Sequence, residues 1–281
     1  MLETHDPEIR QIVQQVETKI QEIPLIGFIL GSGLGEFAEE VKNPIIMPTS
    51  SLPDYPRSTV SGHAGKLVAG RIGEVSVMIV QGRVHYYEGY PISKVVYPVR
   101  LLAALGAQAL IVTNAAGGMG EEFQPGDLMA ITDQVNLMGV NPLVGQSWGF
   151  ETFPDMTDAY DPKLRQALHR AAKSVNVILK EGVLGGWMGP SYETATEVRL
   201  LKMVGVSAAC MSTIPEVIAA ARLRLRLAGI SCITNMATGF STTPLTHEEV
   251  KVTAAKVQVK FRTLLKAAIP EIAAIIGHSE R

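Results

Sequence analysis

Two short segments carry side chains that suit the binding of an anion. In GSGLG (31–35), the glycines let the backbone approach an oxyanion closely, and Ser32 and the backbone N–H groups can donate hydrogen bonds to it. In QGRVHYYEGY (81–90), Arg83 and His85 alternate, so both project from the same side of an extended chain. Arginine can fork onto two phosphate oxygens, and histidine supplies a donor that changes protonation near neutral pH. The two segments favour a phosphate site, although each alone is also compatible with an ordinary turn.

Known nucleotide-binding motifs do not explain these glycines. Glu36 stands where the third glycine of the dinucleotide motif GxGxxG belongs. GHAGK (62–66) is not a P-loop, because Val60 occupies the position of that motif's first glycine and Leu67 replaces its Ser or Thr. Hydride transfer and nucleotide-driven phosphoryl transfer therefore lose support. His63, within GHAGK, is a further candidate donor to an anion.

Two later segments carry groups that suit the edge of a planar heterocycle. In GPSYETATE (189–197), Glu193 could accept hydrogen bonds from a ring N–H, and Tyr192 could pack against the ring. Glu193 could equally cap the helix that follows it. Asn235, in SCITNMATG (231–239), offers one acceptor and two donors to a ligand edge, or could form a turn. Both interpretations stay open for each residue.

Hydrolytic and metal-dependent chemistries lack their motifs here. The sequence contains no GxSxG nucleophile elbow and no HExxH pair. Cys210 and Cys232 form no CxxC pair and have no histidine at ligand spacing. We therefore expect two reduced core thiols and no metal site.

The charge balance argues against nucleic acid as a ligand. Lys and Arg number 25 against 27 Asp and Glu, a formal net charge of −2, and no run of five or six like charges occurs. The N-terminal segment lacks the basic start and apolar stretch of a signal peptide, so we expect a cytoplasmic protein. Residues 101–120 carry no charge, but they include Gln108, Asn114 and four glycines. A buried strand and a glycine loop explain them better than a membrane span.

Apolar strand-like runs alternate with amphipathic helical segments along nearly the whole chain. This pattern is typical of helices packed on a mainly parallel sheet, so the fold class is α/β. Helices are predicted at 7–22, 93–106, 161–175, 193–204, 214–228 and 246–268. Strands are predicted at 25–30, in a hairpin over 66–82, and at 109–118, 126–135, 177–184, 207–212 and 230–235. Because no linker or repeat interrupts the pattern, we expect a single domain over 1–281.

These elements place the candidate residues at the ends of strands. GSGLG follows the strand at 25–30, and NAAGG (114–118) ends the buried strand at 109–118. In open α/β sheets, ligands bind at the carboxyl ends of the strands. The aromatic-rich segment 136–160 shows no periodicity, and a loop of that length is usually functional or part of an interface.

Eight motifs, in this order, resemble the trimeric purine nucleoside phosphorylase family. They are GSGLG (31–35), GHAGKLV (62–68), QGRVHYYEGYP (81–91), VTNAAGG (112–118), FPDMTDAYD (153–161), GPSYET (189–194), MSTIPEV (211–217) and ITN…HEEV (233–250). Each motif is weak alone, but the ordered set is highly specific and covers residues 25 to about 250. The resemblance implies a single α/β domain with a mixed, partly barrel-like sheet flanked by helices, assembled as a homotrimer.

The resemblance also implies a reaction. A purine ribonucleoside or 2′-deoxyribonucleoside and inorganic phosphate give the free base and α-(deoxy)ribose 1-phosphate, with no metal or organic cofactor. By family position, phosphate would be bound by Ser32, His63, Arg83, His85, Ala115 through its backbone, and Ser212. Ribose would be bound by Tyr87, Met211, His247 and the neighbouring subunit's Phe153, and the purine by Tyr192, Glu193 and Asn235. The implied catalytic residues are His85, Glu193, Asn235 and His247, and Glu88 would orient His85 or the sugar.

The residue types at the implied purine site favour 6-oxopurines. Asn235 can donate to N7 or O6, and Glu193 can accept from N1–H and an exocyclic amine. Adenine lacks the N1–H donor, which would leave buried groups unpaired. Inosine and guanosine are therefore the predicted substrates. Met188 and Cys210 depart from the family pattern beside this site, where Ala or Thr and Gly are usual.

Three alternatives stay open. A 5′-methylthioadenosine phosphorylase, which usually carries Asp at the position of Asn235, would cleave adenine nucleosides and not inosine. A nucleoside-binding sensor or a catalytically dead subunit is the second, and the joint presence of Ser32, Arg83, His85, Glu193 and Asn235 argues against it, because a sensor would not need a phosphate site beside a base site. A hydrolase would release the base without phosphate.

Overall fold

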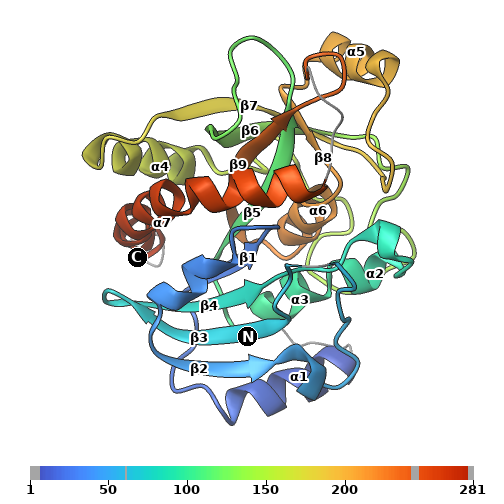
Figure 1. Cartoon of the computed structure of the whole chain (residues 1–281). Coiled ribbons are helices and arrows are strands. Elements are labelled where there is room, and N and C mark those ends of the chain that lie inside the picture. Colours follow the sequence, from blue (N-terminus) through green and yellow to red (C-terminus); the bar gives the residue numbers. More distant parts are fainter. Residues whose placement is uncertain (1–6, 61, 242–246, 278–281) are drawn as a thin grey trace.

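A nine-stranded mixed sheet forms the centre of the computed structural model, which describes residues 7–60, 62–241 and 247–277 (Figure 1). The strands are β1 (Ile26–Leu30), β2 (Lys42–Pro48), β3 (Lys66–Ile72), β4 (Val75–Gln81), β5 (Ala109–Gly118), β6 (Leu128–Asn136), β7 (Leu179–Gly186), β8 (Ala208–Cys210) and β9 (Arg226–Met236). Their order is β2-β3-β4-β1-β5-β8-β7-β6-β9, and β9 also pairs with β5. This second pairing closes five strands into a barrel, from which the other four extend. The expected α/β fold with a partly barrel-like sheet is confirmed.

β5 is the strand where the open sheet and the barrel meet. It pairs in parallel with β1 and, over its whole length, with β9, and its last two residues pair antiparallel with β8. β1 also pairs in parallel with β4. Parallel strands end at the same edge of a sheet, so the carboxyl ends of β1, β4, β5 and β9 lie together.

Helices cover both faces of the sheet. One face is packed by α1 (Pro7–Glu17), α3 (Tyr97–Ala104) and α6 (Ile214–Arg222), and the other by α4 (Pro162–Ser174) and α7 (His247–Gly277). α2 (Ile92–Val95) lies against α3 and α6. α5 (Ala195–Met203) packs near one end of the barrel through Val198 and Leu201. Short 3₁₀ helices are η1 (Gly35–Glu40), η2 (Thr49–Ser51) and η3 (Tyr86–Glu88).

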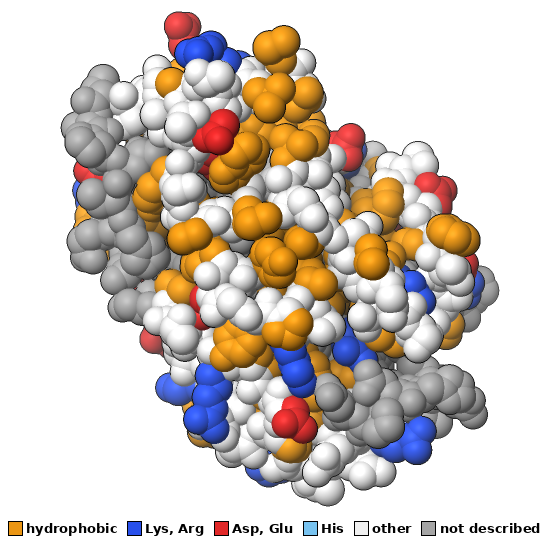
Figure 2. All heavy atoms as spheres, turned by 90° about the vertical axis from the view of Figure 1, so that its right-hand side faces the viewer, with side chains coloured by type: hydrophobic (Ala, Val, Ile, Leu, Met, Phe, Trp, Pro, Cys, Tyr) orange, Lys and Arg blue, Asp and Glu red, His pale blue; other side chains and the backbone are white. Residues whose placement is uncertain are grey.

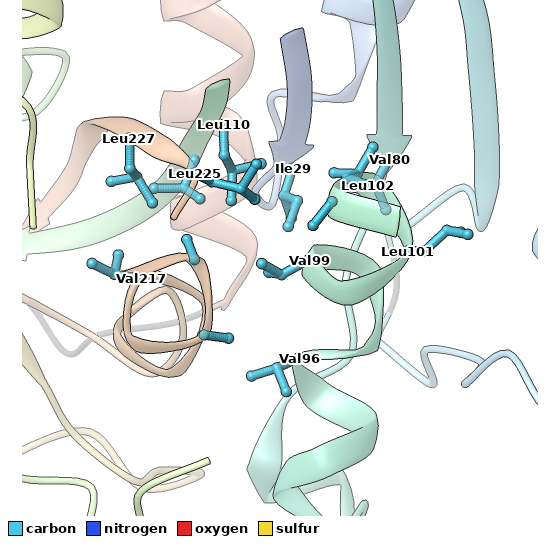
Figure 3. Close-up of a cluster of buried hydrophobic side chains, with 14 of the residues drawn as sticks. Ile29, Val80, Val96, Val99, Leu101, Leu102, Leu110, Val217, Leu225 and Leu227 are labelled. Carbon is cyan, nitrogen blue, oxygen red and sulfur yellow. The ribbon is translucent and has the colours of Figure 1, made fainter. Parts of the chain in front are cut away.

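Alternation along the strands decides which face each side chain joins. In β1, Ile29 belongs to the core on the α3 side, whereas Phe28 belongs to the core on the α7 side. Figure 3 shows Ile29 and Leu110 from the sheet meeting Val99 of α3. The site described below is therefore built on strands that are buried on both faces.

Several predicted elements need correction. The helix predicted over 214–228 ends at Arg222, because Arg224 takes a positive φ of 56° and the Leu225 N–H donates to the Ala220 carbonyl. The alternating residues that follow belong to β9. The helix predicted over 7–22 ends at Glu17, and the one predicted over 93–106 is divided into α2 and α3.

One strand has no counterpart in the sequence prediction. β2 contains two prolines and a positive-φ residue, Asn43, and its register with β3 shifts between Lys42 and Ile45. Proline is tolerated at the edge of a sheet, where its missing N–H faces no partner strand. β2 is an edge strand, and its prolines interrupt the alternation of apolar and polar residues from which a strand is predicted.

Arginines hold the long segment between β6 and α4 on the molecule. The Trp148 ring lies between two guanidinium groups, 4.9 Å from that of Arg100 and 5.3 Å from that of Arg222. Arg222 also donates to the backbone carbonyls of Gln146 and Trp148. Farther along this segment, the Phe153 side chain is 92% exposed.

Hydrophobic side chains are spread over the face on which α2 and α5 lie in Figure 1, as Figure 2 shows. No helix among the described residues has the length and apolar character needed to cross a membrane.

Candidate active site

A pocket at the carboxyl ends of the parallel strands gathers most of the predicted site residues. Its walls come from the segments after β1 and β4, from β5, from the ends of β8 and β9, and from the segment before α5. The predicted residues that line it are Ser32, Arg83, His85, Tyr87, Ala115, Tyr192, Glu193, Met211, Ser212 and Asn235. Val250 of α7 adds an apolar contact to the wall.

A close backbone approach fixes the first glycine segment. A Cβ at Gly31 would lie 2.7 Å from the Asn114 Cα, so only glycine fits between β1 and β5. The Gly31 N–H donates to the Thr113 hydroxyl at 3.0 Å. Ser32 consequently lines the same pocket as β5. The expected helix after GSGLG is the short 3₁₀ helix η1.

Arg83 is buried in the pocket wall, and protein groups accept its hydrogen bonds. Its Nη1 donates to the hydroxyls of Ser212 at 2.8 Å and Thr213 at 2.9 Å. Its Nη2 donates to two backbone carbonyls, those of Ile29 and Thr113. A direct fork of Arg83 onto phosphate would have to replace some of these bonds. In this arrangement Arg83 contributes positive charge to the pocket and holds Ser212.

The charge of Arg83 is paired inside the protein. Its Nε lies 3.3 Å from Oε1 of Glu216, and both side chains are only 1% exposed. Burial raises the pKa of the Glu216 carboxyl, and the charge of Arg83 opposes that rise. Glu216 was absent from the sequence-predicted site because it falls on the helix α6, in a position that pattern alone assigns to packing.

The turn that presents Ser212 is strained. Thr213 has φ 63° and ψ −53°, and the Ile214 N–H donates to the Ser212 carbonyl at 2.6 Å, which defines a γ-turn with positive φ. A β-branched residue rarely takes this conformation. The Thr213 hydroxyl is held by Arg83 and also by Nδ2 of Asn114 at 3.1 Å. Buried hydrogen bonds therefore maintain the strain at the pocket.

His85 is oriented by Glu88, as the sequence interpretation suggested. The His85 Nδ1 lies 2.9 Å from Oε1 of Glu88, and the His85 backbone N–H donates to the same oxygen at 2.7 Å. Because a carboxylate only accepts, Nδ1 carries the ring hydrogen, and protonation would make Nε2 a second donor. The ring stacks on Tyr87 with centroids 4.7 Å apart.

Glu88 also holds a neighbouring segment. It accepts hydrogen bonds from the Thr59 backbone N–H and hydroxyl and from the Ser58 hydroxyl. Burial alone would raise the pKa of Glu88, but the hydrogen bonds from His85 and Thr59 lower it to about 2. Glu88 is therefore a permanent anion at neutral pH.

His63 contacts Ser32 and Arg83 from behind the pocket. Its Nδ1 accepts a hydrogen bond from the Arg83 backbone N–H at 3.2 Å, so the neutral ring carries its hydrogen on Nε2. Nε2 lies 3.2 Å from the Ser32 hydroxyl. His63 is not among the residues that line the pocket, and it lies behind Ser32.

The Glu193 carboxylate is buried and weakly solvated. Burial raises the pKa of Glu193, and the charge of Glu197 adds to the rise. Its neighbour Tyr192 lines the same pocket, and burial also raises the pKa of that phenol. The capping role that the sequence left open falls to Thr194, whose side chain accepts from the Glu197 N–H at the start of α5. Glu193 is thus available to face a ligand.

A bulge in β9 brings Asn235 to the pocket. Ala116 pairs with Ile233 but Gly117 pairs with Asn235, so Thr234 is an extra residue in the ladder. Thr234 and Asn235 both line the pocket as a result. The Asn235 Nδ2 donates to the Met236 carbonyl at 3.2 Å, and its Oδ1 accepts from the Thr234 hydroxyl at 3.0 Å. Because a carbonyl cannot donate, the amide orientation is fixed, and one N–H of Nδ2 remains for a ligand.

The residues that the resemblance implied for ribose have mixed outcomes. Tyr87 and Met211 line the pocket, and burial together with the charge of Glu88 raises the pKa of Tyr87 to about 12. Phe153 does not line this pocket. His247 is the first residue of α7, and its side chain lies outside the described residues. Of the two departures from the family pattern, Cys210 lines the pocket and Met188 does not.

The structure adds pocket residues that the sequence did not single out. Asn114 and Thr234 line the pocket, and Thr213 lies directly behind Ser212. Asn114 and Thr234 fall inside predicted strands, where a polar side chain facing a ligand cannot be told from one facing the core. The positive φ of Thr213 has no sequence signature, since Thr is not a residue that favours it.

The arrangement can bind an oxyanion beside a planar base. Hydroxyl groups, an imidazole and a buried arginine line the pocket together with a carboxylate and an amide. The described residues contain no group of three or more His, Cys, Asp or Glu side chains placed to hold a metal ion.

Comparisons with known proteins agree on one group of enzymes. Residues 25–270 match the model of the phosphorylase superfamily. The chain is 49% identical to purine nucleoside phosphorylase 1 of Bacillus subtilis over 91% of this chain and 95% of that protein. It is 47% identical to purine nucleoside phosphorylase 1 of Geobacillus stearothermophilus, over 94% and 97%. Its structure is similar to Schistosoma mansoni purine nucleoside phosphorylase, solved with inosine and with adenosine, with a TM-score of 0.89, 32% identity and coverage of 94% and 96%.

Proposed function

Because this chain belongs to the purine nucleoside phosphorylase family, we propose that it uses inorganic phosphate to cleave 6-oxopurine nucleosides, with inosine and guanosine as its substrates. Family membership makes the chain an enzyme that phosphorolyses purine nucleosides. The choice among purines and the roles of individual residues are the proposal.

One observation carries the proposal. The pocket brings Glu193 and Asn235 together with Ser32, His85 and Ser212. A base site and an oxyanion site in one pocket are what phosphorolysis requires, since phosphate must attack the sugar carbon that the base leaves. A sensor or a hydrolase would need only the base side.

The proposed mechanism assigns opposite charges to the two ends of the pocket. Cleavage of the glycosidic bond builds positive charge on the sugar and negative charge on the departing purine. Phosphate, held by Ser32, His85, Ser212 and the backbone at Ala115, would stabilise the cationic sugar from one face. At the other end, the remaining N–H of Asn235 would donate to N7 or O6 as charge develops on the purine.

The geometry of the base side supports the 6-oxopurine preference. Glu193 is a buried carboxylate that can only accept when ionised, which suits N1–H and the 2-amino group of guanine. Asn235 offers the remaining N–H of Nδ2 as a donor, while Thr234 fills one of the two acceptor sites of its Oδ1. Adenosine would place an acceptor, N1, against the carboxylate, so we expect it to react poorly.

The direct test follows base release from inosine, guanosine, adenosine and 5′-methylthioadenosine, each with and without phosphate. Cleavage of inosine and guanosine that depends on phosphate is the expected result. Cleavage of the adenine nucleosides alone would instead make the chain a 5′-methylthioadenosine phosphorylase. Base release at the same rate with and without phosphate would rule out phosphorolysis.

Asn235→Asp tests the assignment of the base edge. The carboxylate removes the N–H donor and provides an acceptor for a 6-amino group, so we expect the inosine-to-adenosine ratio of kcat/KM to fall at least tenfold. The measurement is kcat/KM for both nucleosides at saturating phosphate. An unchanged ratio would show that Asn235 does not contact position 6 or 7 of the purine.

We further propose that the active form is a homotrimer in which Phe153 covers the ribose of the neighbouring subunit. Phe153 is almost fully exposed and lies away from the pocket of its own chain, which supports a role in another subunit. By the same family position, His247 would approach the ribose 5′-hydroxyl, and His63 would support phosphate through Ser32.

A further inference from the structure

The hydroxyl groups of Thr213 and Ser212 form a short chain behind the pocket. The two oxygens lie 3.2 Å apart, and Arg83 Nη1 donates to both of them. Asn114 Nδ2 donates to Thr213 as well. The hydroxyl of Ser212 lines the pocket, whereas the side chain of Thr213 is buried behind it.

Counting donors and acceptors fixes the direction of this chain. A hydroxyl has one hydrogen and two acceptor sites. The Thr213 oxygen accepts from Arg83 and from Asn114, so both its acceptor sites are filled and its hydrogen must be donated to Ser212. The Ser212 oxygen then accepts from Thr213 and from Arg83. Its own hydrogen finds no nitrogen or oxygen acceptor among the described residues. The neighbouring sulfur of Cys210, which shares a side-chain hydrogen bond with Ser212, is only a weak acceptor, so the hydrogen is available to an oxyanion in the pocket.

Arg83 begins this series of hydrogen bonds, and it can only donate them. Arginine carries donors only, and the Arg83 guanidinium is held by the carbonyls of Ile29 and Thr113 and by Glu216. The γ-turn at Thr213 holds the two hydroxyls next to each other. Thr213, the residue with the strained backbone, therefore accepts hydrogen bonds from both buried donors, Arg83 and Asn114.

We propose that Thr213 is a positioning residue that fixes the Ser212 hydroxyl as a hydrogen-bond donor toward phosphate. This inference rests on the proposed function, because it assumes that phosphate occupies this end of the pocket. A hydroxyl that can only donate suits an oxyanion, which only accepts, and it needs no reorientation when the anion binds. The strain at Thr213 is thus tied to recognition of the anion.

Thr213→Val tests the proposal, because valine keeps the shape and branching of threonine but lacks the hydroxyl. We expect the KM for phosphate to rise about tenfold, with the KM for inosine and kcat at saturating phosphate much less affected. Thr213→Ser, which restores the hydroxyl, should restore most of the phosphate affinity. An unchanged KM for phosphate, or equal increases in the KM values for phosphate and for inosine, would overturn the proposal.

A double-mutant cycle separates action through Ser212 from a general structural effect. If Thr213 acts by orienting Ser212, Thr213→Val should have little further effect on the phosphate KM in a Ser212→Ala background. Additive losses would contradict the proposal. Failure of the proposed function itself is distinguished by the unmodified enzyme, which would then cleave inosine at the same rate without phosphate.

Discussion

Single residues in this pocket are held in states that water would not favour. Glu193 is buried without a cationic partner among the described residues, and Thr213 has a backbone conformation that threonine rarely takes. Both features cost folding free energy and leave a group prepared for a ligand. Activity and stability should therefore trade against each other at these positions.

Glu193→Gln is expected to show this trade. Burial raises the pKa of Glu193, so the ionised carboxylate destabilises the folded state, and this effect grows as pH rises through that pKa. Glutamine should therefore increase the free energy of unfolding at about pH 8, with a smaller increase at about pH 5. It should also lower kcat/KM for guanosine about a hundredfold or more, since an amide cannot replace both acceptor oxygens that face N1–H and the 2-amino group.

Urea unfolding at the two pH values and steady-state kinetics check both parts of this expectation. A variant that is less stable than the unmodified protein at the higher pH would mean that Glu193 has a stabilising partner in the folded enzyme.

At the scale of elements, strand ends and their irregularities build the site. The segment after β4 supplies Arg83 and His85, and the bulge at Thr234 turns Asn235 toward the same pocket. Glu88 connects η3 with the segment at residues 58 and 59. A single carboxylate thus orients His85 and fastens a neighbouring loop.

The contribution of Glu88 to the free energy of unfolding should decrease as the pH falls into the acid range. Its folded-state pKa is about 2, below its ordinary value of 4.5, so its stabilising effect is present above that ordinary value and is lost as pH falls toward 2. We expect Glu88→Gln to lower the free energy of unfolding at neutral pH, and we expect the difference from the unmodified protein to shrink through this acid range. Denaturant unfolding across the range measures it.

Glu74→Gln is the matched control, because the Glu74 carboxylate is exposed on the hairpin between β3 and β4. It should change the stability little at any pH. A difference for Glu88→Gln that stays constant across the acid range would show that the loss is steric and does not involve the charge.

Much of this element structure could be predicted from the sequence, because period-2 and helical patterns persist in strands and helices buried against one core. β1, the hairpin of β3 and β4, and β5 are confirmed near their predicted bounds. β2 was not predicted, because its two prolines interrupt the alternation of apolar and polar residues. The helix predicted over 214–228 was too long, because α6 ends where Arg224 takes a positive φ, which the sequence pattern does not indicate. Motif order located the pocket, but the donor network behind it depends on contacts between β4, β5 and β8 that no local pattern encodes.

At the scale of the whole molecule, the segment between β6 and α4 is attached through Trp148 but exposes the side chain of Phe153. Trp148 is held between Arg100 and Arg222, while Phe153 projects into solvent. An exposed aromatic side chain on an anchored loop is suited to contact another subunit.

Mixing two inactive chains tests whether Phe153 serves a neighbour. Phe153→Ala leaves a chain with an intact pocket, and Glu193→Ala leaves a chain with a defective pocket and an intact Phe153. In a randomly mixed cyclic oligomer, about a quarter of the sites would combine the intact pocket with the intact Phe153. We expect inosine phosphorolysis to recover well above the average of the two pure variants after they are dissociated and reassembled together.

Each pure variant, treated in the same way, is the control for this mixing experiment. No recovery on mixing, or full activity of Phe153→Ala alone, would show that Phe153 does not complete a neighbouring site.

The position of β5 has a consequence for how such enzymes diversify. This strand is shared by the open sheet and the barrel, and it pairs with β1, β8 and β9. A recombination point within β5 would therefore combine part of this strand with partner strands from another relative, and we expect such a chimera to be less stable than either parent. New substrate preferences are more accessible through point substitutions at strand ends, which leave this shared strand intact.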